Sequence, residues 1–479
     1  MIHVDRDSKI PLIDQIVLQL AGQIQDGQLP PGTRLPSIRK LAATVPVSAA
    51  TVVAAYDRLT ARGLIEARAA SGYFVALPRQ QVPRVARPAS EPVHLDAVGL
   101  LRGMMQRTEG LTPVGSGFLP EHWLEDMLNA RLLSRVARSG KRFYAQPAHP
   151  QGYPPLREQL ALKLGLMGIP TSPDNLLTTF GVTQGFDLIC RALLSPGETV
   201  AVEEPAYFGL YAQLRAYGLK LVGVPRLISG PDLEVLEQVC QTHRPRLFFT
   251  QTLLHNPTGG STDPVTAFRL LELARRHGFM IVEDDVCGDF HPTANPLRLA
   301  QVDRLERVIF LSSFSKVMSP ALRVGYLAAA PRLLELFLEQ KMLSVLTSSE
   351  FDERLVFELL TGGQYRKHLE RIRPRLSHSR ASAIRGLREV GLQPALDAEG
   401  GMYIWAALPE GVDLQILADD AVANGYLLTP GNAFFLRQPE RAWLRFSAAA
   451  ANDGKLFDYF RKRLPLLVAH SPGLPIRAG

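Results

Sequence analysis

Residues 77 to 91 divide the chain into two parts of unequal size. This segment reads LPRQQVPRVARPASE and holds three prolines and three arginines without apolar periodicity. A stretch of this composition buries too little apolar surface to fold, so we expect a linker over residues 77–92. The chain should therefore form a small amino-terminal domain, residues 1–76, and a much larger body.

The net charge of +7 is concentrated at one end of the chain. Between residues 27 and 90, nine side chains are Lys or Arg and two are Asp or Glu, so this segment alone holds a surplus of seven. A basic segment joined to a long, electrically balanced chain is typical of a domain that binds a polyanion. Charge alone is explained equally well by a solvated arginine-rich surface.

The length and the cysteine content restrict the class of protein. The chain has 479 residues, 46% of them apolar, which is enough to bury cores in two or three domains. Cys190, Cys240 and Cys287 are too few and too scattered for a disulfide framework or a structural zinc site, so we expect a reducing compartment and no metal. No run approaches ~18 apolar residues, and the first ten residues lack the apolar stretch of a signal peptide. We therefore expect a cytoplasmic protein with no membrane partner.

Residues 11 to 75 show three helical patterns followed by a hairpin pattern. Apolar residues recur every four positions from Leu12, and Gly27 ends this first helix. A second helix opens at Pro36-Ser37, and Ser48 is a suitable N-cap for a third. Two short strands around Ser71-Gly72 complete the pattern of an α+β winged helix-turn-helix domain.

This domain carries a specific family resemblance. The run LPPGTRLPSIR at residues 29–39, with Thr51, Tyr56 and Ser71-Gly72-Tyr73, closely resembles GntR-family DNA-binding domains. In a helix-turn-helix the second helix places its first turn in the major groove, where side chains meet phosphates and base edges. The resemblance implies double-stranded promoter DNA as a partner. The DNA contacts that it implies are Arg34, Ser37, Arg39, Ser48, Thr51, Arg68 and Gly72.

One position departs from the pattern of the GntR family. The residue after Ser48 is commonly Arg in such domains, and here it is Ala49. An arginine there could bind guanine through two hydrogen bonds, a contact worth ~1–3 kcal/mol of discrimination. We therefore expect an operator that differs from the family's common one, or an affinity that depends more on Arg34, Arg39 and Arg68.

The body shows a different pattern. From about Val93 the chain alternates short apolar strands with helical stretches, which predicts an α/β domain with a mostly parallel sheet. We expect a large domain over residues 93–345 and a small α+β domain over residues 346–479. Ligands bind at the carboxyl ends of such strands, so the polar residues that follow them are the site candidates. The expected strands include 176–179, 199–202, 246–250, 280–283 and 308–311.

The strongest candidate is the run SSFSK at residues 312–316, followed by Arg323. A lysine after a buried strand, beside serines and an arginine, suits an amine that forms a Schiff base next to a phosphate. Gly181-Val182-Thr183 opens a helix whose free N–H groups also suit a phosphate.

Three other strand ends add polar or aromatic side chains. Asn256 lies in a turn where its amide could bind a phenolate oxygen, and Tyr207 could stack on a ring. Asp284 and Asp285 end another strand, and one of them could keep a pyridinium nitrogen protonated.

Together these motifs resemble the fold type I, class I aminotransferase family of pyridoxal phosphate proteins, over roughly residues 95–470. The resemblance implies an α/β/α fold with pyridoxal 5'-phosphate as the cofactor. It makes Lys316 the catalytic lysine that forms the Schiff base, Asp284 the pyridinium partner and Asn256 the contact of the cofactor's O3′ oxygen. Tyr207 would stack on the ring, and Asp285 is expected to be structural. The residues implied for the phosphate are Val182, Thr183, Ser313, Ser315, Arg323 and, from the neighbouring subunit of a homodimer, Tyr144.

Two further positions bear on the chemistry of the body. Arg445, in the run WLRFS, matches the family's arginine for a substrate carboxylate, and its planar fork suits that role. The family commonly has a tyrosine three residues after the pyridinium aspartate, at the cofactor, and here this residue is Cys287. A thiol is a weak donor, so we expect cofactor binding to survive this change better than turnover.

A GntR-type head joined to an aminotransferase-like body is the architecture of MocR-type transcriptional regulators, which the chain resembles end to end. This resemblance implies a homodimer in which pyridoxal phosphate, or an amino compound that reacts with it, alters promoter binding. Two alternatives stay open: an active aminotransferase whose head regulates its own gene, and a regulator that has lost the cofactor. Cys287 argues against the first, and the intact Lys316, Asp284, Asn256 and Arg323 argue against the second.

Overall fold

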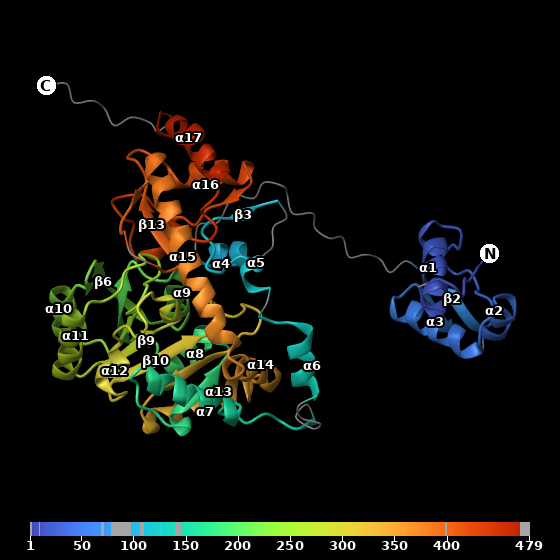
Figure 1. The fold of residues 1–479 in the computed structure, drawn as a ribbon, viewed down its shortest axis with the longest axis horizontal. Coiled ribbons are helices and arrows are strands. Elements are labelled where there is room, and N and C mark those ends of the chain that lie inside the picture. Colours follow the sequence, from blue (N-terminus) through green and yellow to red (C-terminus); the bar gives the residue numbers. More distant parts are fainter. Residues whose placement is uncertain are drawn as a thin grey trace. The chain divides into compact units, whose positions relative to one another are not determined.

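The chain separates into two compact units, Met1–Glu91 and Pro92–Gly479 (Figure 1). A computed structural model describes residues 2–8, 10–68, 71–77, 97–105, 110–125, 127–138, 145–397 and 400–469. Apart from Leu77, the residues expected to form the linker lie outside this description, and so does Tyr144.

The amino-terminal unit is a winged helix-turn-helix domain, which confirms the prediction. Helices α2 and α3 turn by 117° across a short break, within the range typical of a helix-turn-helix. Among the described residues no single helix is long and apolar enough to cross a membrane, and the one bent pair with suitable length and composition is this α2 and α3. The elements of the unit are α1 (Leu12–Gln25), α2 (Ile38–Thr44), α3 (Ala49–Ala61), β1 (Ile65–Arg68) and β2 (Gly72–Val75).

Serine caps and one tyrosine fix the helix pair of this unit. The hydroxyls of Ser37 and Ser48 accept hydrogen bonds from backbone N–H groups three residues on, so α2 and α3 begin where the sequence predicts. Tyr56 of α3 is fully buried among the apolar side chains of the helices, and its hydroxyl donates to the carbonyl of Pro36 at 2.8 Å. The start of α2 is therefore tied to the middle of α3.

In the described part of the body the main sheet has eight strands in the order β4-β11-β10-β9-β8-β5-β6-β7. The central strands β10, β9, β8, β5 and β6 are parallel, as the sequence predicts. The sequence prediction missed β11, which runs antiparallel between β10 and β4. The strands are β4 (Leu176–Thr179), β5 (Thr199–Glu204), β6 (Lys220–Leu227), β7 (Gly230–Pro231), β8 (Leu247–Thr250), β9 (Met280–Asp284), β10 (Val308–Ser313) and β11 (Gly325–Ala328).

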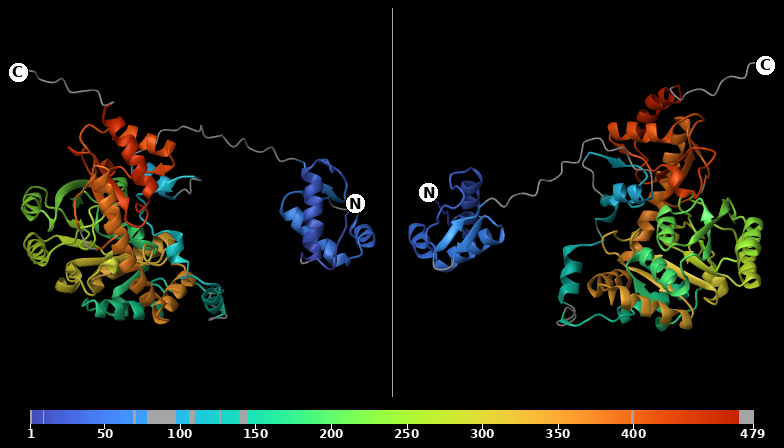
Figure 2. Two further views of the ribbon diagram at one scale, coloured as in Figure 1. Left: turned by 45° about the horizontal axis from the view of Figure 1, so that its top comes forward. Right: turned by 180° about the vertical axis from the view of Figure 1, so that it is seen from behind.

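Helices cover both faces of this sheet, which gives the expected α/β/α layers (Figure 2). Along β10, Val308 and Phe310 belong to one buried core, whereas Ile309 and Leu311 belong to the other. Helices α8 (Gly181–Leu193), α9 (Phe208–Ala216) and α13 (Pro331–Val345) pack in the second core. The first core contains side chains of α7 (Pro154–Leu166), α10 (Leu233–His243), α11 (Pro264–His277), α12 (Leu299–Asp303) and α14 (Glu350–Thr361).

A smaller antiparallel sheet forms the other part of the body. It contains β12 (Gln393–Pro394), β13 (Tyr403–Ala407) and β15 (Trp443–Ser447), with α16 (Leu414–Ala423) and α17 (Gly454–Ala469). The long helix α15 (Gln364–Glu389) runs from the large layers to this sheet (Figure 1). Because α14 packs in the core of the large layers, that core continues past residue 345, and the division of the body there remains a proposal.

The first residues of the body also contribute to the smaller part. β3 (Thr112–Pro113) pairs with β14 (Tyr426–Leu427), and Val114 is buried in the core of the small sheet. The short helices α4 (Ala97–Met105), α5 (Glu121–Leu124) and α6 (Ala130–Arg138) lie on either side of this segment in the chain. The smaller part of the body is therefore built from segments near both of its ends.

Candidate cofactor site and DNA-binding face

A cavity of about 610 Å³ opens at the carboxyl ends of the parallel strands. Its size is within the range of ordinary small-molecule sites. The structure brings nine of the predicted cofactor residues together on its wall. They are Val182, Thr183, Tyr207, Asn256, Asp284, Ser313, Ser315, Lys316 and Arg323.

Lys316 lies in the turn that follows β10, with its amine inside the cavity wall. Burial lowers the pKa of this amine from 10.5 to about 8, so an appreciable share is unprotonated and nucleophilic near neutral pH. The Nζ atom lies 4.2 Å from the centre of the Phe118 ring, on a loop before α5. A Cβ atom on Gly117 would come within 2.9 Å of this Nζ, so a side chain at residue 117 would displace the amine from this position.

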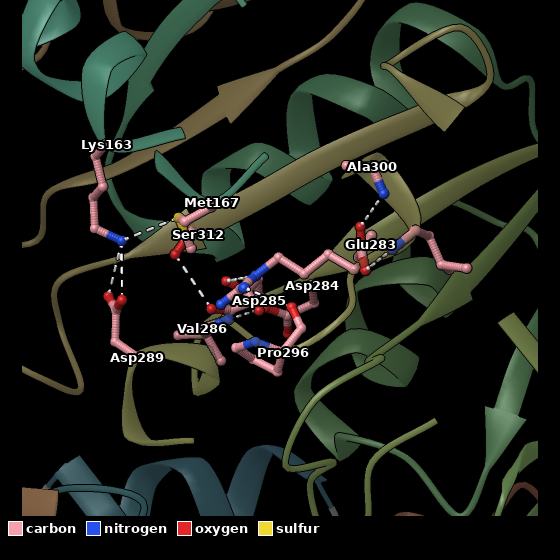
Figure 3. Close-up of polar contacts among 12 residues, drawn as sticks. Lys163, Met167, Glu283, Asp284, Asp285, Val286, Asp289, Pro296, Ala300 and Ser312 are labelled. Carbon is pink, nitrogen blue, oxygen red and sulfur yellow. Dashed lines mark hydrogen bonds and ion pairs between the residues drawn. The ribbon is translucent and has the colours of Figure 1, made fainter. Parts of the chain in front are cut away.

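Two of the three acids at the end of β9 serve the fold (Figure 3). The carboxylate of Glu283 accepts the first backbone N–H groups of α12, at 2.9 and 2.8 Å. Asp285 pairs with Arg298 at 3.0 Å, and both side chains are 2% exposed. Because its carboxylate is bonded to a buried guanidinium, Asp285 stabilises the fold.

Asp284 is the acid of this run that lines the cavity. Its Oδ1 atom accepts the backbone N–H of Val286 at 3.0 Å, which holds the carboxyl group in place. Burial raises the pKa of Asp284 from 3.8 to about 7, so a cation in the cavity is needed to keep it ionised. A pyridinium nitrogen is such a cation.

The start of α8 and Arg323 form a cradle at one end of the cavity. Arg323 donates from Nη1 to the hydroxyl of Ser315 at 3.3 Å and from Nη2 to the carbonyl of Phe180 at 3.1 Å. α8 begins at Gly181, where a Cβ atom would come within 3.1 Å of that Nη2. The guanidinium, the serine hydroxyls and the free N–H groups of the helix therefore converge on one place, which suits a phosphate dianion.

Arg445 lies immediately behind the cavity wall. It comes from β15 and is 2% exposed, and burial lowers the pKa of its guanidinium. It donates from Nη1 to Oδ1 of Asn256 at 2.9 Å and from Nη2 to the carbonyl of Gly115 at 2.7 Å. Because the amide oxygen of Asn256 is held in this way, its NH₂ group is the part that can donate to a ligand in the cavity.

Cys287 and Tyr403 alter the pattern expected around the cofactor. The Cys287 side chain is fully buried, and burial raises the pKa of its thiol to about 12. Tyr403 of β13 lines the cavity, and its hydroxyl lies 3.1 Å from the position that a Cβ on Gly117 would take. The sequence motifs assigned no role to Tyr403, Phe118 or Gly117. A tyrosine hydroxyl reaches the site from the small sheet.

The predicted DNA contacts form an exposed face of the head. Arg34, Arg39 and Arg68 are exposed, and Arg68 donates to Glu66 at 2.8 Å and lies 4.5 Å from the Phe74 ring centre. Gly72 has a φ of +101°, and Arg34 passes 3.8 Å from its Cβ position. Of the other predicted contacts, Ser37 and Ser48 are exposed helix caps, and Thr51 is half-buried one turn into α3.

Comparisons with known proteins identify both parts of the chain. The model of the bacterial regulatory proteins, gntR family, matches residues 12–75, and the model of aminotransferase class I and II matches residues 111–464. The HTH-type transcriptional regulator YdcR of Escherichia coli K12 is 30% identical over 443 residues, which cover 91% of this chain and 94% of that protein. The chain belongs to the MocR-type transcriptional regulators.

Two further proteins are similar to this MocR-type regulator. A probable rhizopine catabolism regulatory protein, MocR of Rhizobium meliloti, is 28% identical over 461 residues, which cover 92% of this chain and 90% of that protein. The crystal structure of LysN, an alpha-aminoadipate aminotransferase of Thermus thermophilus, is 29% identical, with a TM-score of 0.69. That comparison covers 77% of this chain and 97% of LysN, which is complexed with N-(5'-phosphopyridoxyl)-L-leucine.

Pyridoxal 5'-phosphate is accordingly the cofactor of this MocR-type regulator. The residues present fit the group. A cradle that a side chain at Gly181 would obstruct suits its phosphate, Asp284 suits its ring nitrogen, and the depressed pKa of Lys316 suits its carbonyl carbon. The head is a DNA-binding domain of the GntR type.

Proposed function

We propose that this MocR-type regulator holds promoter DNA with its head and senses an amino compound in the cofactor cavity of its body. The observation that carries the proposal is the hydrogen bond from Arg445 to Asn256. Arg445 lies on the small sheet and suits a ligand carboxylate, whereas Asn256 lies beside the large sheet and suits the cofactor. The hydrogen bond between them therefore links the two parts of the body. A ligand that binds one arrangement of these two parts better than another shifts the regulator between states.

Pyridoxal 5'-phosphate supplies an electrophilic carbonyl carbon and, once its nitrogen is protonated, an electron-withdrawing ring. In our proposal Lys316 would be the amine that holds the cofactor at this carbon, and the Asp284 carboxylate would hold the proton on the ring nitrogen. The Asn256 NH₂ group donates to the phenolate oxygen, and Tyr207 stacks on the ring. The residues that bind the phosphate are Val182, Thr183, Ser313, Ser315 and Arg323.

We propose that regulation, rather than turnover, is the main use of this site. Cys287 lies where the family commonly has a donor tyrosine, and its buried thiol is a weak donor. Transamination is the second candidate, favoured by the likeness to an aminotransferase structure and by the low pKa of Lys316. Tyr403 supports this second candidate, because its hydroxyl offers a donor from another direction.

We also propose that the regulator acts as a homodimer, to which the partner subunit's Tyr144 adds a phosphate contact. Paired heads match paired operator half-sites, and a two-fold dimer provides them. The body exposes large apolar side chains, for example Leu166 of α7 at 85% and Leu343 of α13 at 82%. Exposed apolar surface of this kind supports association with a second copy.

The proposal is tested by following the visible absorbance of the bound cofactor and DNA affinity together, with a duplex selected from the source genome by binding. An amino compound that changes the absorbance should also change the dissociation constant for the duplex. Arg445→Gln should keep the absorbance band and lose the response to compounds that bear a carboxylate. Absorbance changes without any change in DNA affinity would contradict sensing, and repeated turnover with a keto acid would establish the enzyme.

A further inference from the structure

The body carries a concentrated basic element of its own. α15 contains eight Lys or Arg residues and two Glu among 26 residues, a surplus of six positive charges. The whole chain of 479 residues has a surplus of seven. The body is therefore balanced only as a sum, because this one helix carries a surplus of six positive charges.

Two of these arginines bond to backbone carbonyls of the body, and two others pair with acids. Arg380 is buried and donates to the backbone carbonyl of Tyr403, and Arg373 donates to the carbonyl of Asp289 at 2.8 Å. Arg366 pairs with a glutamate one turn on, and Arg388 pairs with an aspartate after β12, at 2.8 and 2.7 Å. These side chains hold the fold or are neutralised by acids.

The remaining cations share one exposed face, which we call the basic stripe. Its members are Lys367, Arg371, Arg375 and Arg385. At about 100° of rotation per residue the four fall within an arc of about 80° on the helix. From the first to the last they extend over about 27 Å, at a rise of about 1.5 Å per residue.

Trp123 holds the middle of the stripe. The Arg375 guanidinium lies 4.2 Å from the centre of this ring, and Arg371 donates to the carbonyl of the same residue at 3.4 Å. Trp123 is only 4% exposed, so the surrounding side chains hold its ring in place. Cations held in this way lose less conformational entropy when they bind an anion than cations on free side chains do.

We propose that the basic stripe of α15 binds the phosphate backbone of the duplex that the head recognises. A row of cations about 27 Å long matches a polyanion that carries one charge per about 1.7 Å of its axis. Such contacts add affinity and fix orientation without reading sequence. Through Arg380, the same helix contacts the backbone of Tyr403 on the cavity wall, so the ligand site and the stripe share one helix. This inference rests on the proposed function, because it requires the chain to bind DNA.

The test uses the full-length protein with Lys367→Gln, Arg375→Gln and Arg385→Gln combined. The matched control removes three exposed arginines from other helices of the body, with Arg269→Gln and Arg275→Gln on α11 and Arg332→Gln on α13. The measurement is the dissociation constant for a promoter-length duplex of mixed sequence across a salt series. The stripe variant should bind at least about tenfold more weakly at low salt, and its slope of log affinity on log salt should fall by about 2 to 3.

The cofactor band and the thermal unfolding of both variants check that the body remains folded. Equal losses in the stripe variant and the control would overturn the proposal, because the effect would then be one of net charge. An unchanged salt slope in the stripe variant would overturn it as well. If Arg39→Ala weakens binding while the stripe variant does not, the stripe alone is refuted, whereas a wild-type protein that binds no duplex refutes the DNA-binding function too.

Discussion

The Arg445 guanidinium of the small sheet donates to the amide oxygen of Asn256, in the loop after β8, at 2.9 Å. Both side chains are buried, so the bond forms in a medium of low dielectric constant, where it is strong and costly to leave unmade. In the proposed function, a ligand carboxylate at Arg445 would compete with the amide for this donor. The position of the Asn256 amide would then depend on whether a ligand occupies Arg445.

Asn256→Ala should weaken both the fold and the cofactor site. It deprives Arg445 of a buried acceptor, which should lower the free energy of unfolding by about 1–3 kcal/mol. It also removes the donor to the cofactor, so the dissociation constant for pyridoxal 5'-phosphate should rise. Urea unfolding and cofactor titration measure these effects. Gln238→Ala, at an exposed position of α10, is the control that should change neither.

Lys316→Ala should abolish the visible absorbance band of the bound cofactor, because it removes the amine that attaches to it. Absorbance of the purified protein, after addition of pyridoxal 5'-phosphate and gel filtration, measures this loss. Lys455→Ala on α17 removes an exposed lysine and should leave the band intact. A persistent band in the Lys316 variant would show that another amine carries the cofactor.

Asp284→Asn should stabilise the cofactor-free protein at neutral pH. Burial raises the pKa of Asp284 to about 7, so the folded state binds this proton more tightly than the unfolded state does, and ionisation costs stability as pH rises from 3.8 toward 7. The variant removes this cost. Its gain over the wild type should therefore be largest above about pH 7 and disappear near pH 4, in urea unfolding across this range.

Burial raises the pKa of Asp285 to about 7 as well, but Asp285→Asn provides a contrast, because this carboxylate has a buried guanidinium as its partner. It breaks the buried pair with Arg298 and leaves a guanidinium without its anion, so we expect a loss of about 3–5 kcal/mol at neutral pH. Equal effects of the two substitutions would contradict the assignment of Asp284 to the cofactor and Asp285 to the fold.

Gly117→Ala should reduce cofactor attachment while the body still folds. The new methyl group would lie 2.9 Å from Nζ of Lys316 and 3.1 Å from the hydroxyl of Tyr403, so the ends of these side chains must move. The rate of band formation after cofactor addition measures the effect. Gly165→Ala, in α7 with nothing within 4 Å of the added carbon, is the control and should form the band at the wild-type rate.

Arg39→Ala and Ser48→Ala should separate DNA contact from head stability. Arg39 is exposed on α2, so its loss should weaken duplex binding and flatten the salt dependence without changing the unfolding of the head. Ser48 caps α3, so its loss should also destabilise the head by about 1 kcal/mol. Fluorescence anisotropy with a labelled duplex and thermal unfolding measure the two effects. Unchanged duplex binding in the Arg39 variant would remove this residue from the DNA face.

The cofactor wall could be predicted because its residues follow buried strands directly in the sequence. Lys316, Asp284 and Asn256 each lie within a few residues of a strand that reads as a short apolar run, and parallel strands bring such positions together. The caps at Ser37 and Ser48 were equally readable, since a serine before an amphipathic stretch satisfies a local hydrogen bond. These are all features that depend on near neighbours in the chain.

The missed residues depend on long-range packing. Gly117 and Phe118 follow no strand of the main sheet, and Tyr403 comes from the small sheet, so only the folded chain places them beside Lys316. β11 was missed because its four residues begin with Gly325 and end with Ala328, and both residue types are depleted in strands. The basic stripe was not apparent from the net charge, because acidic residues elsewhere in the body offset its positive charge.

The position of Val114 in the small-sheet core sets the order in which the body can be completed. Its core partners include Leu444 and Phe460, which leave the ribosome more than 300 residues later. At about 5–20 residues per second, roughly 15 to 70 s pass between the synthesis of these segments. The large sheet can assemble during this interval, but the segment around β3 has to wait with its apolar side chains uncovered. Chains that stop before β15 should therefore be substrates for chaperones and proteases even when their cofactor wall is otherwise intact.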